Sequence, residues 1–127
     1  MVEWLLVHAG VVSSGEYLRK CPQTSKAVLR ALKRATATIN DGRDTVVPIV
    51  AKEMRLSEEM ARDIMALNIY SMEMDEKIYR GMGAFAEFLY QLKRIPQKID
   101  PASVFYTKLL EEVDPTLVRW KSAVAVR

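Results

Sequence analysis

Residues 22–42, PQTSKAVLRALKRATATINDG, decide the fold class of this chain. Pro22 suits the first position of a helix, where its missing N–H leaves no hydrogen bond unmade. Four apolar residues then recur at intervals of four, three and four, the spacing of one helix face. They are Val28, Leu32, Ala35 and Ile39. The run 40–42, Asn-Asp-Gly, has turn chemistry that ends a helix, so we predict a helix from Pro22 to about Ile39.

Upstream of this helix the chain changes character. The segment Val2–Val12 is rich in β-branched residues and is interrupted by Gly10, which favours a strand over a helix. Ser13 with Glu16 three positions later matches a capping box, which predicts a short helix that includes Tyr17 and Leu18.

Downstream, residues that typically start helices recur along the chain. Asp44 is a plausible N-cap for a helix in which Pro48 lies within or just past the first turn, where proline is tolerated. Its apolar positions are Val47, Val50 and Met54. Ser57 is expected to cap the next helix, with Glu58 and Glu59 near its positive end. We expect that helix to bury Met60, Ile64 and Leu67.

The chain after residue 74 has three further start signals. Asp75 is expected to open the longest helix, which ends before Pro96. Its predicted apolar face is Ile78, Met82, Phe85, Leu89 and Leu92. Asp100-Pro101 and Asp114-Pro115 each match an N-cap followed by proline at the first helical position. The apolar repeat after Asp75 covers about two heptads, too few for a coiled coil, so a core helix is the better interpretation.

The predicted fold class is therefore mainly α, with one N-terminal β-strand followed by about six to seven helices. We expect residues 1–127 to form a single helical domain or subdomain, with a hinge-like strand over 1–12 and a helical region over 13–127. The 127 residues are 50% hydrophobic and 28% charged, which is ordinary for a folded domain that needs neither disulfides nor metals.

Composition excludes several classes of function. A net charge of +3 is too small to indicate a nucleic-acid partner. One cysteine cannot form an intrachain disulfide, and one cysteine with one histidine does not make a zinc site. No window reaches the ~18–20 apolar residues of a membrane span. The first residues lack the basic start of a signal peptide, which predicts a cytoplasmic chain as written, and no cofactor or metal is expected.

The candidate catalytic residues each have a simpler structural explanation. His8 lies in an apolar segment with no orienting partner in the sequence, so we interpret it as structural. Cys21 precedes Pro22 at a helix start, which would favour a thiolate, but no base is visible beside it. Ser13-Ser14 has no G-x-S-x-G context, and capping explains it. We therefore predict no catalytic residue and no enzyme activity.

Charged runs are interpreted in the same way. The pairs Glu58-Glu59, Asp75-Glu76 and Glu111-Glu112 do not converge on one point, because adjacent helical residues point about 100° apart. Four basic residues share a helix face opposite the apolar one, namely Lys26, Arg30, Lys33 and Arg34. A solvated face is the better interpretation, since no aromatic residues interleave for base stacking. An interaction module that binds an acidic protein or nucleic acid through this face is the alternative.

The order of these segments resembles one family. Residues 11–65, VVSSGEYLRKCPQTSKAVLRALKRATATINDGRDTVVPIVAKEMRLSEEMARDIM, look like the run after the final hinge strand of nitrate/sulfonate/taurine-type solute-binding proteins of ABC importers. Residues 74–113, MDEKIYRGMGAFAEFLYQLKRIPQKIDPASVFYTKLLEEV, are similar to that family's closing pattern. The superfamily also includes thiamine-precursor synthases. Cys21 departs from the pattern, which has Asn or a similar cap before the proline.

The resemblance implies the C-terminal part of a type II periplasmic binding protein fold. In that family two α/β lobes clasp a solute, so the resemblance implies that the first lobe and most of the second are absent here. No ligand-contact motif has a matching position, and the ligand-binding residues stay unknown. We expect a non-catalytic chain without solute binding of its own. A homodimer through the N-terminal strand or exposed helix faces is expected, with an ABC permease as partner for a full-length, periplasmic binding protein.

Overall fold

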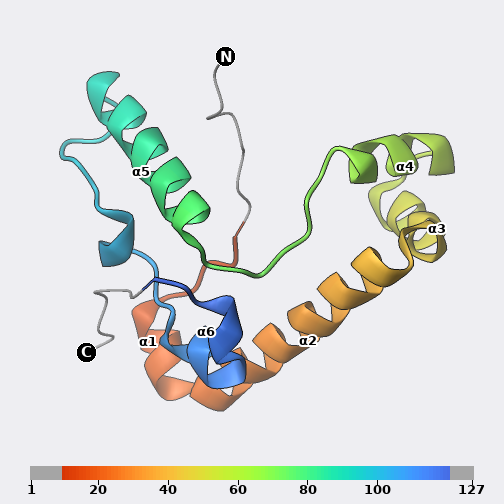
Figure 1. Ribbon diagram of the computed structural model, residues 1–127, viewed down its shortest axis with the longest axis horizontal. Coiled ribbons are helices and arrows are strands. Elements are labelled where there is room, and N and C mark those ends of the chain that lie inside the picture. The colour runs from red at the N-terminus through yellow and green to blue at the C-terminus, as the bar shows by residue number, and fades with distance from the viewer. Residues whose placement is uncertain (1–9, 121–127) are drawn as a thin grey trace. The chain divides into compact units, whose positions relative to one another are not determined.

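The computed structural model describes residues 10–120 and is mainly helical (Figure 1). The predicted strand Val2–Val12 lies almost wholly outside the described residues, and residues 10–12 are in no strand. Six α-helices and two 3-10 helices follow: α1 Gly15–Lys20, α2 Pro22–Asp41, α3 Arg43–Met54, α4 Glu58–Ala66, α5 Glu76–Gln91, η1 Pro101–Ser103, α6 Lys108–Val113 and η2 Pro115–Leu117.

The chain divides into two compact units. One contains the described residues 10–27 and 73–120, and the other contains residues 28–72. The helix α2 begins in the first unit and continues in the second, because the unit boundary falls after Ala27.

The start of α1 lies one residue later than predicted. Ser14, not Ser13, is the N-cap, and its side-chain oxygen accepts a hydrogen bond from the N–H of Tyr17 at 3.1 Å. Glu16 therefore occupies the second helical position, so it cannot complete the predicted capping box. It forms an ion pair with Lys20 instead, with 2.6 Å between the charged atoms.

The buried side of α2 is also displaced from the predicted face. Val28 is 46% exposed and Ala35 is exposed, so the prediction that they form the buried face is wrong. Besides Pro22 and Lys26, the less exposed positions recur at intervals of four, three, four and three residues: Ser25, Leu29, Leu32, Thr36 and Ile39. Val28 and Leu29 are adjacent, and α2 has apolar residues on two neighbouring faces, so periodicity alone does not choose between them.

In the unit of residues 28–72, α3 packs against α4 (Figure 1). The core residues are Val46, Val47, Ala51, Ala61 and Met65, and Ile39, Val50 and Tyr70 pack against them. Gly42, not the predicted Asp44, is the N-cap of α3. Asp44 lies in the first turn and forms an ion pair with Arg62 of α4, which joins the two helices at their surface.

The apolar face predicted for α4 is not the one that α3 covers. Ser57 caps this helix as predicted, and its side-chain oxygen accepts from the N–H of Met60 at 3.2 Å. However, Met60 is 52% exposed and Leu67 is 86% exposed. The buried residues are Ala61 and Met65, four positions apart, because the small Ala61 allows close approach to α3.

This assignment predicts opposite outcomes for two truncations in α4. Met65→Ala should lower the free energy of unfolding by about 2–5 kcal/mol, because Met65 is only 1% exposed and the change leaves a cavity. Leu67→Ala should change it by no more than about 0.5 kcal/mol, because the side chain is exposed. Urea unfolding followed by circular dichroism measures both values. Equal losses for the two variants would contradict the observed packing.

The helix α3 ends at a residue with a left-handed backbone. Arg55 has a φ of 57°, and the N–H of Leu56 donates to the carbonyl of Ala51 at 2.9 Å. This is a Schellman-type ending, in which glycine is the usual residue because it has no Cβ to strain the backbone.

Arg55→Gly should therefore raise the free energy of unfolding by about 1 kcal/mol, since it relieves a left-handed conformation. Lys52→Gly is the matched control within the same helix, where glycine should instead cost about 1 kcal/mol. Urea denaturation of the two variants beside the wild type gives the comparison. A destabilised Arg55→Gly chain would show that the Arg55 side chain contributes more than its backbone strain costs.

The unit of residues 10–27 and 73–120 confirms three predicted helix starts. Asp75, Asp100 and Asp114 are N-caps, each with a carboxylate oxygen that accepts a backbone N–H two or three residues later. The helices after the two Asp-Pro pairs are single 3-10 turns. The helix after Asp75 has 16 residues, whereas α2 has 20, so the prediction that it is the longest is wrong.

The helix α5 does not bury its predicted face. Phe85 and Leu92 are each 53% exposed, and Ile78, Met82 and Leu89 are half-buried. None of the sixteen residues of α5 is fully buried. The buried residues of this unit lie elsewhere, chiefly Pro101 of η1, Thr107, and Leu109 and Leu110 of α6. Gly83 of α5 faces Pro101, whose Cγ would be 3.8 Å from an added Cβ.

Candidate functional site

Cys21 occupies the junction of two helices. Its N–H donates to the carbonyl of Tyr17 at 2.8 Å, which ends α1. Its own carbonyl accepts from both the N–H and the hydroxyl of Ser25, each at 3.0 Å. Through these backbone contacts Cys21 ends α1 and holds the first turn of α2, so its position is explained by its structural role. His8, the only histidine of the sequence, lies outside the described residues.

The acidic pairs have separate partners. Glu76 forms an ion pair with Arg80 at 2.8 Å, while Asp75 caps α5. Glu111 accepts a hydrogen bond from the hydroxyl of Thr107 at 3.3 Å. Glu58 and Glu59 are exposed in the first turn of α4. Within residues 10–120, no three His, Cys, Asp or Glu side chains are grouped as metal ligands.

The predicted basic face of α2 is interrupted by Lys26. Its side chain is only 15% exposed, and its ammonium lies 3.0 Å from a carboxylate oxygen of Glu112 in α6. Arg30, Lys33 and Arg34 are exposed as predicted. Glu112 is 86 positions away in the sequence, so spacing on α2 could not reveal this pair. The pair leaves Arg30, Lys33 and Arg34 as the exposed part of the predicted basic face.

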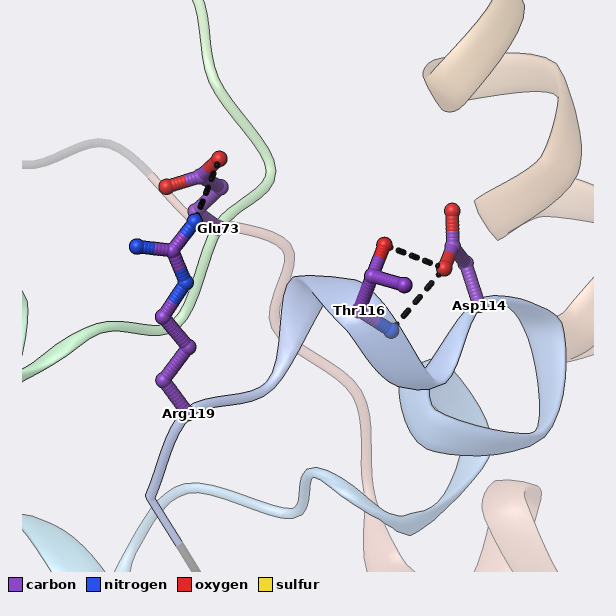
Figure 2. A network of polar contacts seen from close by, with 4 residues as sticks. All are labelled: Glu73, Asp114, Thr116 and Arg119. Atoms are coloured by element: carbon purple, nitrogen blue, oxygen red, sulfur yellow. Dashed lines mark hydrogen bonds and ion pairs between the residues drawn. The ribbon is translucent and has the colours of Figure 1, made fainter.

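Polar contacts join the two ends of the described segment 73–120 (Figure 2). Glu73 and Arg119 form an ion pair at 3.4 Å. Beside it, Met74 accepts from the N–H of Arg119 at 2.9 Å and donates to the carbonyl of Leu117 at 2.7 Å. Asp114 accepts from the N–H and the hydroxyl of Thr116, at 3.0 and 2.6 Å (Figure 2). These contacts hold the backbone of residues 73–74 beside that of residues 117–119.

An aromatic cluster lies next to these polar contacts. The ring of Trp120 is 5.2 Å from that of Tyr79 and 5.9 Å from that of Phe105, centroid to centroid. The Tyr79 hydroxyl donates to Asp100 at 2.9 Å, and this hydrogen bond raises the pKa of Tyr79. The same Asp100 oxygen accepts the N–H of Ala102, so one carboxylate both caps η1 and orients Tyr79. The cluster packs η1 against α5.

A second polar contact joins α5 to the segment that follows it. The ammonium of Lys98 lies 2.9 Å from a carboxylate oxygen of Glu87 and 5.6 Å from the centre of the Tyr90 ring. The hydrogen bond from Lys98 is the main cause that lowers the pKa of Glu87, and the same bond raises the pKa of Lys98. The contact therefore favours the charged form of both residues.

The lowered pKa of Glu87 predicts a defined pH dependence. The contribution of this pair to stability is present above the unfolded pKa of a glutamate and is lost as the pH falls through the lower folded value. At high pH it is lost again as the pH rises through the raised pKa of Lys98. Lys98→Met should return the pKa of Glu87 towards 4.5, whereas Lys77→Met should leave it lowered. Carboxyl ¹³C chemical shifts during an NMR titration measure this, and an unchanged pKa in Lys98→Met would contradict the contact.

Within residues 10–120, two helices each carry an exposed apolar strip. The first, which we name the α5 stripe, contains Phe85, Phe88 and Leu92, which are 53%, 45% and 53% exposed. The second, the α4 stripe, contains Met60, Ile64 and Leu67, of which Met60 and Leu67 are more than half exposed. Each set recurs at helical spacing, so each forms a continuous strip on one side of its helix. Exposed apolar strips of this kind mark contact surfaces.

Among the described residues, these two stripes are the candidate contact surfaces. In the same part of the chain, no helix is long and apolar enough to cross a membrane. Sequence reasoning placed the α4 stripe, and Phe85 and Leu92 of the α5 stripe, on core-facing sides, because periodicity does not tell which apolar face has a partner. It did not include Phe88 in the predicted face of α5. No protein-family model, curated protein sequence or solved structure matches the chain.

Proposed function

We propose that this chain is the non-catalytic helical C-terminal region of a solute-binding protein of the nitrate/sulfonate/taurine type. In this proposal it acts through the surfaces of its helices and does not hold a solute by itself. The order of the sequence motifs over residues 11–113 supports the kinship. The helix starts at Ser57, Asp75, Asp100 and Asp114 are consistent with that order.

The observation that carries the proposal is the exposure of α5. An amphipathic helix of 16 residues with two phenylalanines, an isoleucine, a methionine and a leucine would normally bury one face. In this chain none of its residues is fully buried, and Phe85 and Leu92 remain half exposed. A helix with this composition is suited to pack against another helical surface.

The proposal has consequences for partners. When the region is part of a complete binding protein, that binding protein would deliver its solute to an ABC permease in the periplasm. The solute itself would be chosen by pocket residues of the lobes. Nitrate, sulfonates, pyrimidines and aromatic acids are all compatible with the resemblance.

The proposal predicts that the small solutes implied by the resemblance do not stabilise this chain. Nitrate, taurine, an alkanesulfonate and a pyrimidine, each at millimolar concentration, should leave the Tm unchanged. A ligand present at 100 times its Kd would stabilise the folded chain by about 2.7 kcal/mol, which raises the Tm of a domain of this size by several degrees. Differential scanning fluorimetry measures the shift. A saturable rise with any of the four would show a binding site within this chain and overturn the proposal.

The alternative is an interaction module that uses the basic face of α2. The pairing of Lys26 with Glu112 disfavours it, since only three of the four basic residues face solvent. A fluorescent DNA duplex tests this alternative directly. Binding whose affinity falls steeply with salt, and falls further in Arg30→Ala, would favour the alternative over the proposed function.

A further inference from the structure

The α5 stripe is bordered by positive charge. Both acids of α5 are engaged in ion pairs, Glu76 with Arg80 at 2.8 Å and Glu87 with Lys98 at 2.9 Å. Three exposed cations near the stripe have no ion-pair partner within residues 10–120, namely Lys77, Lys93 and Arg94. Lys77 lies about three turns before Phe88, so the two share one line along the helix. Lys93 and Arg94 directly follow Leu92.

The α4 stripe is bordered by negative charge. The one cation of α4, Arg62, is engaged with Asp44 of α3. Glu59 and Asp63 directly precede Met60 and Ile64, so both carboxylates lie along the same edge of the stripe. Both residues are exposed, and neither forms an ion pair with any residue between 10 and 120.

We infer that the α4 stripe of one copy of this chain docks on the α5 stripe of a second copy. The contact places Met60, Ile64 and Leu67 against Phe85, Phe88 and Leu92, and it brings the acidic edge of one helix near the basic border of the other. Thioether sulfur against phenyl rings is a favourable pairing. The inference deepens the proposed function, because it names the partner of the exposed helix faces.

Charge complementarity favours a second copy over the other possible occupants. A symmetric α5–α5 contact would bring the basic borders of two copies together, and a symmetric α4–α4 contact would bring together two acidic edges; each repels. An anionic membrane would suit the basic border of α5 and would repel the acidic edge of α4. Only the α4–α5 contact uses both stripes and places unlike charges opposite each other. If it forms reciprocally, it closes a dimer, and otherwise it adds copies head to tail.

Complementation between two variants of the full chain tests the contact. Leu67→Asp disrupts the α4 stripe and Phe85→Asp disrupts the α5 stripe, both at exposed positions. Each variant alone should raise the Kd of self-association by at least about tenfold, as sedimentation velocity measures over a concentration series. An equimolar mixture should associate again, because the intact α4 stripe of the Phe85→Asp chain meets the intact α5 stripe of the Leu67→Asp chain.

Two controls keep the test specific. Ile49→Asp changes a residue of α3 that is 61% exposed and lies outside both stripes, and it should associate like the wild type. A chain with Asp63→Lys should self-associate more weakly, and adding Lys77→Glu and Arg94→Glu to it should restore part of the affinity. Circular dichroism verifies that each variant has the helix content of the wild type.

The contact is overturned if the wild type stays monomeric at about 0.5 mM, a concentration at which a specific dimer of even submillimolar Kd would be populated. It is also overturned if either stripe variant associates like the wild type, or if the mixture fails to associate. Flotation of a monomeric wild type with phosphatidylglycerol vesicles would identify a membrane as the occupant of α5 instead. None of these outcomes depends on the solute experiment, so the proposed function and this contact fail separately.

Discussion

The structure depends on side-chain capping of helix starts. Ser14, Ser57, Asp75, Asp100 and Asp114 each place an oxygen on a backbone N–H two or three residues later. Each such bond satisfies a donor that has no partner within the helix and is worth about 1 kcal/mol. Because few side chains in residues 10–120 are fully buried, packing alone does not fix where the helices begin. The caps set those boundaries, and the boundaries decide which apolar residues face one another.

Packing then selects among the apolar faces that the boundaries allow. In α4, Ala61 and Met65 meet Val47 and Ala51 of α3, so the neighbouring apolar strip with Leu67 stays exposed. In α5 the half-buried side is completed by η1, with Pro101 opposite Gly83 and Tyr79 hydrogen-bonded to Asp100. Both helices are therefore apolar on more than one side. The second side is what gives this chain surfaces for contact, and it is the physical basis of the function that we propose.

The tertiary structure also selects which charged residues are paired. Most ion pairs here are local or join neighbouring elements, and these exposed pairs contribute little to stability. Lys26 and Glu112 differ, because the lysine is largely covered and the pair joins α2 to α6. This contact turns part of an apparently continuous basic face into a structural link. Between residues 10 and 120, the charges without an ion pair beside the two stripes, Glu59, Asp63, Lys77, Lys93 and Arg94, are the ones that we expect to choose a partner.

The sequence by itself determined the fold class, the order of the helices and four of the caps, because Ser, Asp and Asp-Pro act within one turn of the chain. It misplaced two helix starts, at Ser14 and Gly42, where competing polar residues lie within two positions. Only the tertiary structure decided which face of α2, α4 and α5 is covered, and that Lys26 pairs with Glu112. Burial depends on residues distant in sequence, and an apolar period is the same whether a face meets a core or solvent.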